Sequence, residues 1–154
     1  PRFVSAKALA YKIGFLEKVI ERAGGKGILV CLENLSESDV HLAEVFAALP
    51  ELSLTLDLGH AELLTGENTS FGFFDHCPER IRHIHLHDNH GGNSPEDDLH
   101  LPPGEGRIDF RKIFERLHAI NYRETITLEL RPDQIASCLE FVGSLAYPAK
   151  RLGG

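Results

Sequence analysis

The densest group of side chains that could do chemistry lies over residues 82–106. This stretch holds five of the chain's nine histidines, which are His83, His85, His87, His90 and His100, together with Asp88 and Asp98. The first three histidines alternate with Ile84 and Leu86, which is the period-2 pattern of a β-strand. Imidazoles and carboxylates gathered at the end of a strand are typical ligands of divalent transition metals. A polar surface loop with scattered histidines is the plainer interpretation.

Three other predicted strands end in similar chemistry. Strands are expected over residues 28–33, 52–57, 82–87 and 125–130. Each has one aliphatic face and one face of smaller or polar residues, and the polar faces end in Glu33, Asp57, His85 and Glu129. Taken singly, each of these side chains has an ordinary interpretation as an ion pair, a turn residue or a core histidine. Their equivalent places on four strands favour a metal site.

Helices are expected between these strands. The first begins at the capping residue Ser5, the second at Ser36, the third at Asp109 and the last at Pro132. Residues 59–79 are expected to be less regular, with at most a short helix at 61–64. One helix followed by four strand–helix units predicts an α/β fold with a parallel sheet. Because the inner strand faces are polar, a (β/α) TIM barrel is favoured over an open, doubly wound sheet.

The strand count predicts half of such a barrel. A closed barrel has eight strands in roughly 250 residues, whereas these 154 residues provide four. We therefore expect residues 1–154 to form a single domain that needs a second half. That half is either a missing N-terminal half-barrel or a homodimer partner that covers the open edge strands. The absence of methionine, together with a helix at the start, favours the missing half.

The composition narrows the possible partners. A net charge of −7 argues against a nucleic-acid surface. No apolar run approaches the roughly 18 residues of a membrane span, and no signal peptide is recognisable. The three cysteines form no CxxC pair, and two of them lie in apolar patterns, which indicates reduced thiols in a cytoplasmic protein.

Five short motifs together resemble the xylose isomerase-like TIM-barrel superfamily. They are LEN at 32–34, DLGHA at 57–61, HLHDN at 85–89, DLHLPPGEG at 98–106 and LEL at 128–130. The resemblance covers nearly the whole chain but only the C-terminal half of the family's barrel. It implies a metal held by Glu33, Asp57, His85 and Glu129. It also implies that His60 contacts substrate or a second metal, and that Asp98 and His100 match a D-x-H pair that binds zinc in endonuclease IV.

The resemblance and the chemistry point first to a sugar or sugar-phosphate isomerase or epimerase. A divalent Mn²⁺, Zn²⁺ or Mg²⁺ would polarise sugar oxygens, Glu33 and Glu129 would exchange protons, and His60 would bind a hydroxyl. Asp98 and His100 are expected on a mobile loop over the site, where they bind substrate or a second metal. The alternatives are an endonuclease IV-like, zinc-dependent apurinic-site phosphodiesterase and an inactive half-barrel fragment.

Overall fold

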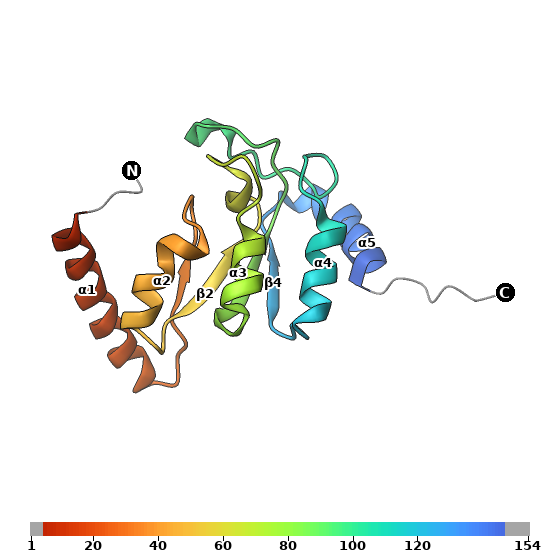
Figure 1. The fold of residues 1–154 in the computed structure, drawn as a ribbon. Coiled ribbons are helices and arrows are strands. Elements are labelled where there is room, and N and C mark those ends of the chain that lie inside the picture. Colours follow the sequence, from red (N-terminus) through yellow and green to blue (C-terminus); the bar gives the residue numbers. More distant parts are fainter. Residues whose placement is uncertain (1–4, 147–154) are drawn as a thin grey trace.

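The computed structural model describes residues 5–146, in which helices and strands alternate (Figure 1). The main elements are α1 (Ala6–Gly24), β1 (Cys31–Glu33), α2 (Asp39–Ala48), β2 (Ser53–Asp57), α3 (Ser70–His76), β3 (Ile81–Leu86), α4 (Phe110–Ala119), β4 (Thr125–Leu128) and α5 (Ile135–Ala146). Short 3-10 turns are η1 (His60–Glu62), η2 (Pro78–Arg80), η3 (Pro95–Asp97) and η4 (Pro132–Gln134). The strands form one parallel sheet in the order β1-β2-β3-β4. The predicted fold class, four parallel strand–helix units after one helix, is confirmed.

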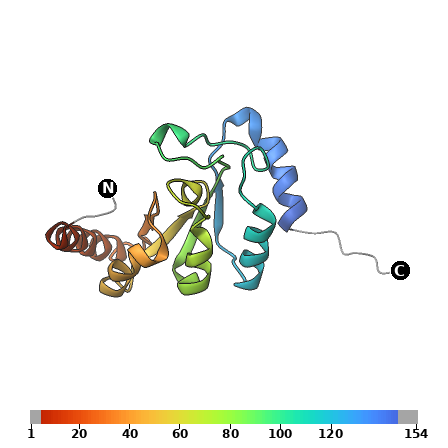
Figure 2. The same cartoon turned by 45° about the horizontal axis from the view of Figure 1, so that its top comes forward.

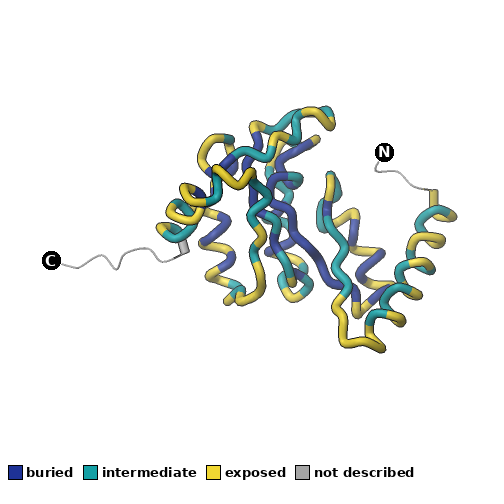
Figure 3. The backbone as a smooth tube through the Cα atoms, turned by 180° about the vertical axis from the view of Figure 1, so that it is seen from behind, coloured by how far each residue is buried: buried dark blue, intermediate teal, exposed yellow. Residues whose placement is uncertain are grey.

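The helices cover one face of the sheet. α2, α3 and α4 lie side by side in front of the strands in Figure 1, and the strands are in view from behind in Figure 3. The helix-facing side chains of the central strands are fully buried, and these are Leu54, Leu56, Ile84 and Leu86. On the other face of β4, Thr125 and Thr127 are exposed. This one-sided arrangement is that of a barrel wall, because a doubly wound sheet has helices on both faces.

The strand register brings the predicted ligands to one edge. Asp57 pairs directly with His85 across β2 and β3. Glu33 pairs with Thr55, which precedes Asp57 by two residues along β2. Thr127 pairs with His85, and Glu129 comes two residues after Thr127. The two glutamates therefore come from the outer strands, where their longer side chains can reach the centre of the sheet. Among residues 5–146, no helix is long and apolar enough to cross a membrane.

Local capping signals explain the starts of α1 and α4. Ser5 Oγ accepts the backbone N–H of Ala8 at 3.2 Å, and Asp109 Oδ1 accepts that of Lys112 at 3.1 Å. The predicted Ser36 cap is wrong, because α2 begins after Ser38, whose backbone N–H donates to His41 Nδ1 at 3.1 Å. The thiols are free as expected, but only Cys138 is buried.

Two predicted elements need correction. The strand expected over 28–33 is shorter, since β1 begins at Cys31 and the side chains of Ile28 and Leu29 are 57% and 53% exposed. The segment 59–79 is more regular than expected, because α3 occupies residues 70–76. This helix has only seven residues and a central Gly72, and the side chain of its N-cap residue Thr69 makes no capping hydrogen bond, so its sequence signals are weak.

Candidate metal centre

The first ligand group surrounds His85 at the carboxyl ends of the strands. His85 Nδ1 lies 3.0 Å from Glu129 Oε1, 3.3 Å from Glu33 Oε1 and 3.6 Å from Asp57 Oδ2. Bonds of about 2.1 Å to one tetrahedral ion would place neighbouring ligand atoms about 3.4 Å apart. Asp57, His85 and Glu129 each offer a ligand atom within 4.8 Å of the others, and Glu33 does the same with Asp57 and His60.

Asp57 is the buried member of this group, and one of its oxygens fits a cation. Its side chain is 0% exposed, and Oδ2 has no hydrogen-bond partner among residues 5–146. His60 Nδ1 and His85 Nδ1 lie 3.4 and 3.6 Å from this oxygen, beyond normal bonding distance. An unsatisfied buried carboxylate oxygen is costly unless an ion or a proton satisfies it. The donor set and this oxygen together fit a divalent metal.

Opposite charges perturb the ionisation of the group. Burial alone would raise the pKa of Asp57, but the adjacent His85, His87 and His60 outweigh it and hold this pKa well below its ordinary value. Contact with Asp57 raises the pKa of His85, with Glu129 and Glu33 adding to the effect against burial. The carboxylates around His85 thus favour positive charge at this point of the site.

A second ligand group lies beside the first and contains Asp98 and His100, as the resemblance implied. Asp98 Oδ2 lies 3.1 Å from His60 Nε2 and 3.3 Å from His100 Nε2. The other nitrogen of each ring bonds a backbone carbonyl, Nδ1 of His60 that of Asn34 at 3.2 Å and Nδ1 of His100 that of Glu129 at 3.0 Å. Such bonds select the tautomer whose Nε2 lone pair is free to bind a metal. His100 adopts a φ of 49°, which few non-glycine residues do.

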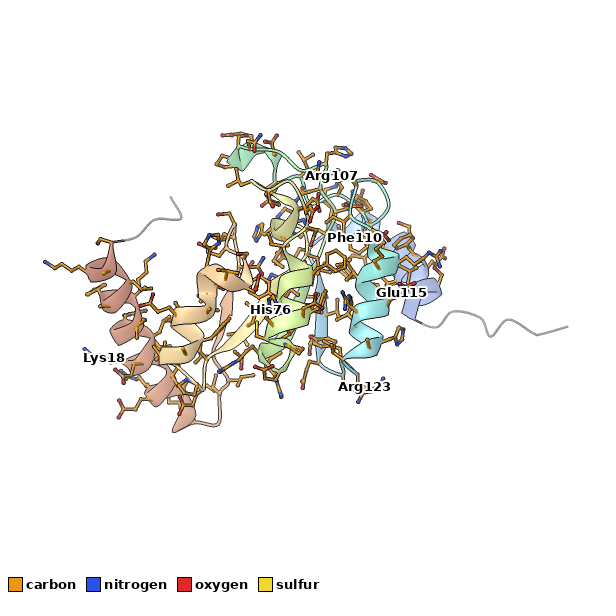
Figure 4. All side chains as sticks on the ribbon, in the orientation of Figure 1. Lys18, His76, Arg107, Phe110, Glu115 and Arg123 are labelled. Carbon is orange, nitrogen blue, oxygen red and sulfur yellow. The ribbon has the colours of Figure 1, made fainter. Side chains whose placement is uncertain are left out.

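The loop that supplies Asp98 and His100 passes over the strand ends (Figure 2) and is anchored by buried polar residues. The Asp88 carboxylate is fully buried and accepts four backbone N–H groups, from Asn89, Gly104, Gly106 and Ile108, at 2.9–3.2 Å. The Asn89 side chain accepts the N–H of Leu99 at 2.7 Å and donates to Asp98 Oδ1 at 3.3 Å. At the outer end of the loop, Arg107 (labelled in Figure 4) donates to buried Glu62.

Sequence reasoning assigned no site role to three residues that hold these groups. Asn34 is fully buried and bonds both backbone groups of Asp57, at 2.8 and 3.0 Å. Asp88 organises the loop. His87, expected on the same strand face as His83 and His85, instead lies past the end of β3 and bonds Asp57 Oδ1 at 3.0 Å. One sequence signal could have indicated these three residues: each directly follows a strand or a predicted ligand at a strand end. A polar side chain that is buried at such a place needs a hydrogen-bond partner.

Fold and site together define the class: a half-barrel (β/α) protein with overlapping clusters of metal-type ligands at the carboxyl ends of its strands. The sequence profile of the xylose isomerase-like TIM barrel family matches residues 5–145. The chain belongs to this family.

Individual relatives are similar over most of this chain. An uncharacterized protein of Methanocaldococcus jannaschii is 32% identical over 120 residues, covering 74% of this chain and 45% of the relative. The 3-dehydro-D-guloside 4-epimerase of Escherichia coli is 26% identical over 133 residues, covering 81% and 46%. The crystal structure of a D-tagatose 3-epimerase-like protein superposes with a TM-score of 0.75 at 28% identity, covering 86% and 52%. The chain thus spans about half the length of the relatives that it matches.

Proposed function

We propose that this chain contributes the metal-binding half of a sugar or sugar-phosphate isomerase or epimerase. The observation that supports this most directly is the placement of Glu33, Asp57 and Glu129 oxygens 3.0–3.6 Å from His85 Nδ1. A divalent ion held by these four residues would supply Lewis-acid polarisation of the sugar oxygens. Mixed carboxylate and imidazole ligation suits Mn²⁺, Zn²⁺ and Mg²⁺. Two relatives named as epimerases, or as epimerase-like, support a sugar as the substrate.

The two glutamates would transfer the protons. Glu33 belongs to β1 and Glu129 directly follows β4, so they come from the two outer strands, and their side chains are 36% and 27% exposed. One carboxylate takes the proton from the carbon beside the carbonyl, and the other returns a proton to the opposite side of that carbon. The result is inverted configuration at one centre. His60, whose side chain is 14% exposed, would accept a hydrogen bond from a substrate hydroxyl through Nε2.

The second ligand group supports a different candidate, a zinc-dependent phosphodiesterase of the endonuclease IV type. Two or more clustered ions can activate a water molecule against a phosphodiester, and His60, Asp98 and His100 would hold an ion beside the first group. The net charge of −7 opposes binding of a polyanionic substrate. We therefore place the isomerase or epimerase first.

The barrel would be completed by additional strand–helix units. β1 and β4 are the edges of the sheet, so each has one side without a neighbouring strand within residues 5–146. Since the chain spans about half of its relatives, an N-terminal half-barrel that pairs with both edges is the partner we propose. A second copy of this chain is the alternative.

Calorimetric titration with Mn²⁺, Zn²⁺ and Mg²⁺, each alone, tests the proposal. We expect uptake by the wild-type chain, loss of uptake at the first group in Asp57→Asn, and no effect of Asp133→Asn, which alters an exposed aspartate. Wild-type protein that takes up none of these ions would contradict the proposal and would support an inert half-barrel.

The reaction is tested by incubating the metal-loaded chain with D-tagatose in D₂O. Deuterium at the carbon beside the carbonyl, absent with Glu129→Gln, is the expected result. Cleavage of a duplex with an abasic site, without exchange into the sugar, would favour the phosphodiesterase instead.

A further inference from the structure

His87 is fully buried, and its imidazole has no role in the metal binding or proton transfer proposed above. Its Nε2 lies 3.0 Å from Asp57 Oδ1, so this nitrogen holds the proton and donates it to the carboxylate. The same oxygen accepts the backbone N–H of His60 at 2.7 Å. Because Oδ1 is bonded twice, Oδ2 is the oxygen that Asp57 presents to His85. His87 therefore helps to fix the orientation of a ligand in the first group.

The face of the same ring supports the second group. It stacks on His100 with ring centroids 3.9 Å apart and planes within 5°, and His60 meets it edge-on at 5.6 Å. A metal ion lies in the plane of the imidazole that binds it, so one ion cannot lie in the planes of two parallel stacked rings. Although His87 Nδ1 has no hydrogen-bond partner within residues 5–146, the stacking makes this ring a support for His100 and not a fellow ligand.

Gly59 lies against the His87 ring, which leaves no room for a side chain at position 59. A Cβ at Gly59 would lie 2.0 Å from His87 Cε1, a distance that no packing tolerates. The φ of Gly59 is −72°, which any residue can adopt, so its conformation does not require glycine. Gly59 therefore leaves the volume that His87 occupies between the two ligand groups.

We propose that His87 is a positioning residue that couples the two metal-binding groups. Its Nε2–H orients Asp57 toward the first group, and its ring face holds His100 in the second. This inference rests on the proposed function for the ion in the first group, and it adds an ion in the second group. Loss of the ring loosens both groups, and by linkage an ion in either group changes the affinity of the other by the same factor.

The test is a calorimetric titration of the full chain with Zn²⁺ alone. His87→Ala removes both the donor and the ring, and we expect both affinities to fall by about 10–100-fold, as for lost partners of metal ligands. His87→Gln retains an N–H donor at about the position of Nε2 without a ring. We expect it to keep the first affinity within about threefold of wild type and to weaken the second by about 10–100-fold.

A control variant and a second variant that displaces the same ring distinguish a positioning role of His87 from a general loss of structure. His76→Gln removes an imidazole that bonds Asp39 at 2.6 Å between α2 and α3, outside both groups, and should leave both affinities unchanged. Gly59→Ala should displace the His87 ring and weaken both groups. In a His87→Ala background the added methyl finds room, so the effect of Gly59→Ala should disappear, which a double-mutant cycle measures directly.

The outcomes distinguish this inference from the function on which it rests. A wild-type chain that takes up no Zn²⁺ overturns the proposed function. Uptake of a single ion, or two ions bound equally tightly by wild type and His87→Ala, overturns only the coupling. If circular dichroism shows that His87→Ala does not fold, His87→Gln and Gly59→Ala give the same comparison. We expect His87→Gln to keep the affinity of the first group and Gly59→Ala to lower it. An equal loss in both variants overturns the role of Nε2.

Discussion

Replacement of Asp88 by asparagine tests how the loop that contains Asp98 and His100 is held. Two of the four backbone N–H groups bond each carboxylate oxygen of Asp88. Asparagine has nearly the same shape, but its NH₂ group would face two donors, so two of the four bonds are lost whichever way the amide turns. A hydrogen bond to a charged group contributes about 1.5–3 kcal/mol. Two such bonds amount to about 3–6 kcal/mol, and because removal of a buried charge offsets part of this, we expect about 3 kcal/mol.

The assay is urea unfolding followed by circular dichroism, with Zn²⁺ titration alongside. Asp97→Asn is the matched control, because Asp97 Oδ2 also accepts two backbone N–H groups, at 2.8 and 2.9 Å, but is only partly buried. We expect Asp88→Asn to lower the free energy of unfolding and to abolish binding at the second group, while the first group keeps its ion. If Asp88→Asn is no less stable than Asp97→Asn, the loop is held by other contacts and the reasoning is wrong.

Three further predictions concern the strand ends and the sheet edges. Asn34→Ala leaves the buried N–H and C=O of Asp57 without their partners and should lower the free energy of unfolding in urea by about 2 kcal/mol, and no change would contradict this. Neighbouring carboxylates raise the pKa values of His60 and His85 although burial lowers them, so the protonated rings should stabilise the metal-free chain. This stabilisation should be complete below about pH 6.5 and be lost as the pH rises through the raised pKa values, whereas metal affinity should rise over the same pH range. If the urea midpoint measured with a chelator does not fall as the pH rises, this prediction is wrong. The open edges of β1 and β4 should make the chain self-associate in sedimentation experiments, and a monomer at all concentrations would show that these edges do not pair.

The sequence alone was sufficient to predict which polar side chains lie at the carboxyl ends of the strands. The alternation along each strand places one ligand at each carboxyl end, and parallel strands bring these ends to one edge. The identities of Glu33, Asp57, His85 and Glu129 could therefore be read from local patterns, and the structure brings all four together. The fold class followed from the same periodicities, because strand–helix alternation leaves few arrangements other than a parallel sheet. The metal-binding role of these residues stays a prediction.

The tertiary structure alone determined the parts of the chain that have no repeating pattern of apolar residues. α3 is too short for a recognisable apolar stripe, and the path of the loop depends on bonds from Asp88 to residues up to 20 positions away. His87 lies past the end of β3, where Gly59, distant in sequence, leaves space for its ring beside Asp57. Alternation predicts the face on which a side chain lies only while the strand continues. Beyond the strand end, burial and long-range hydrogen bonds determine its position, and these exist only in the folded chain.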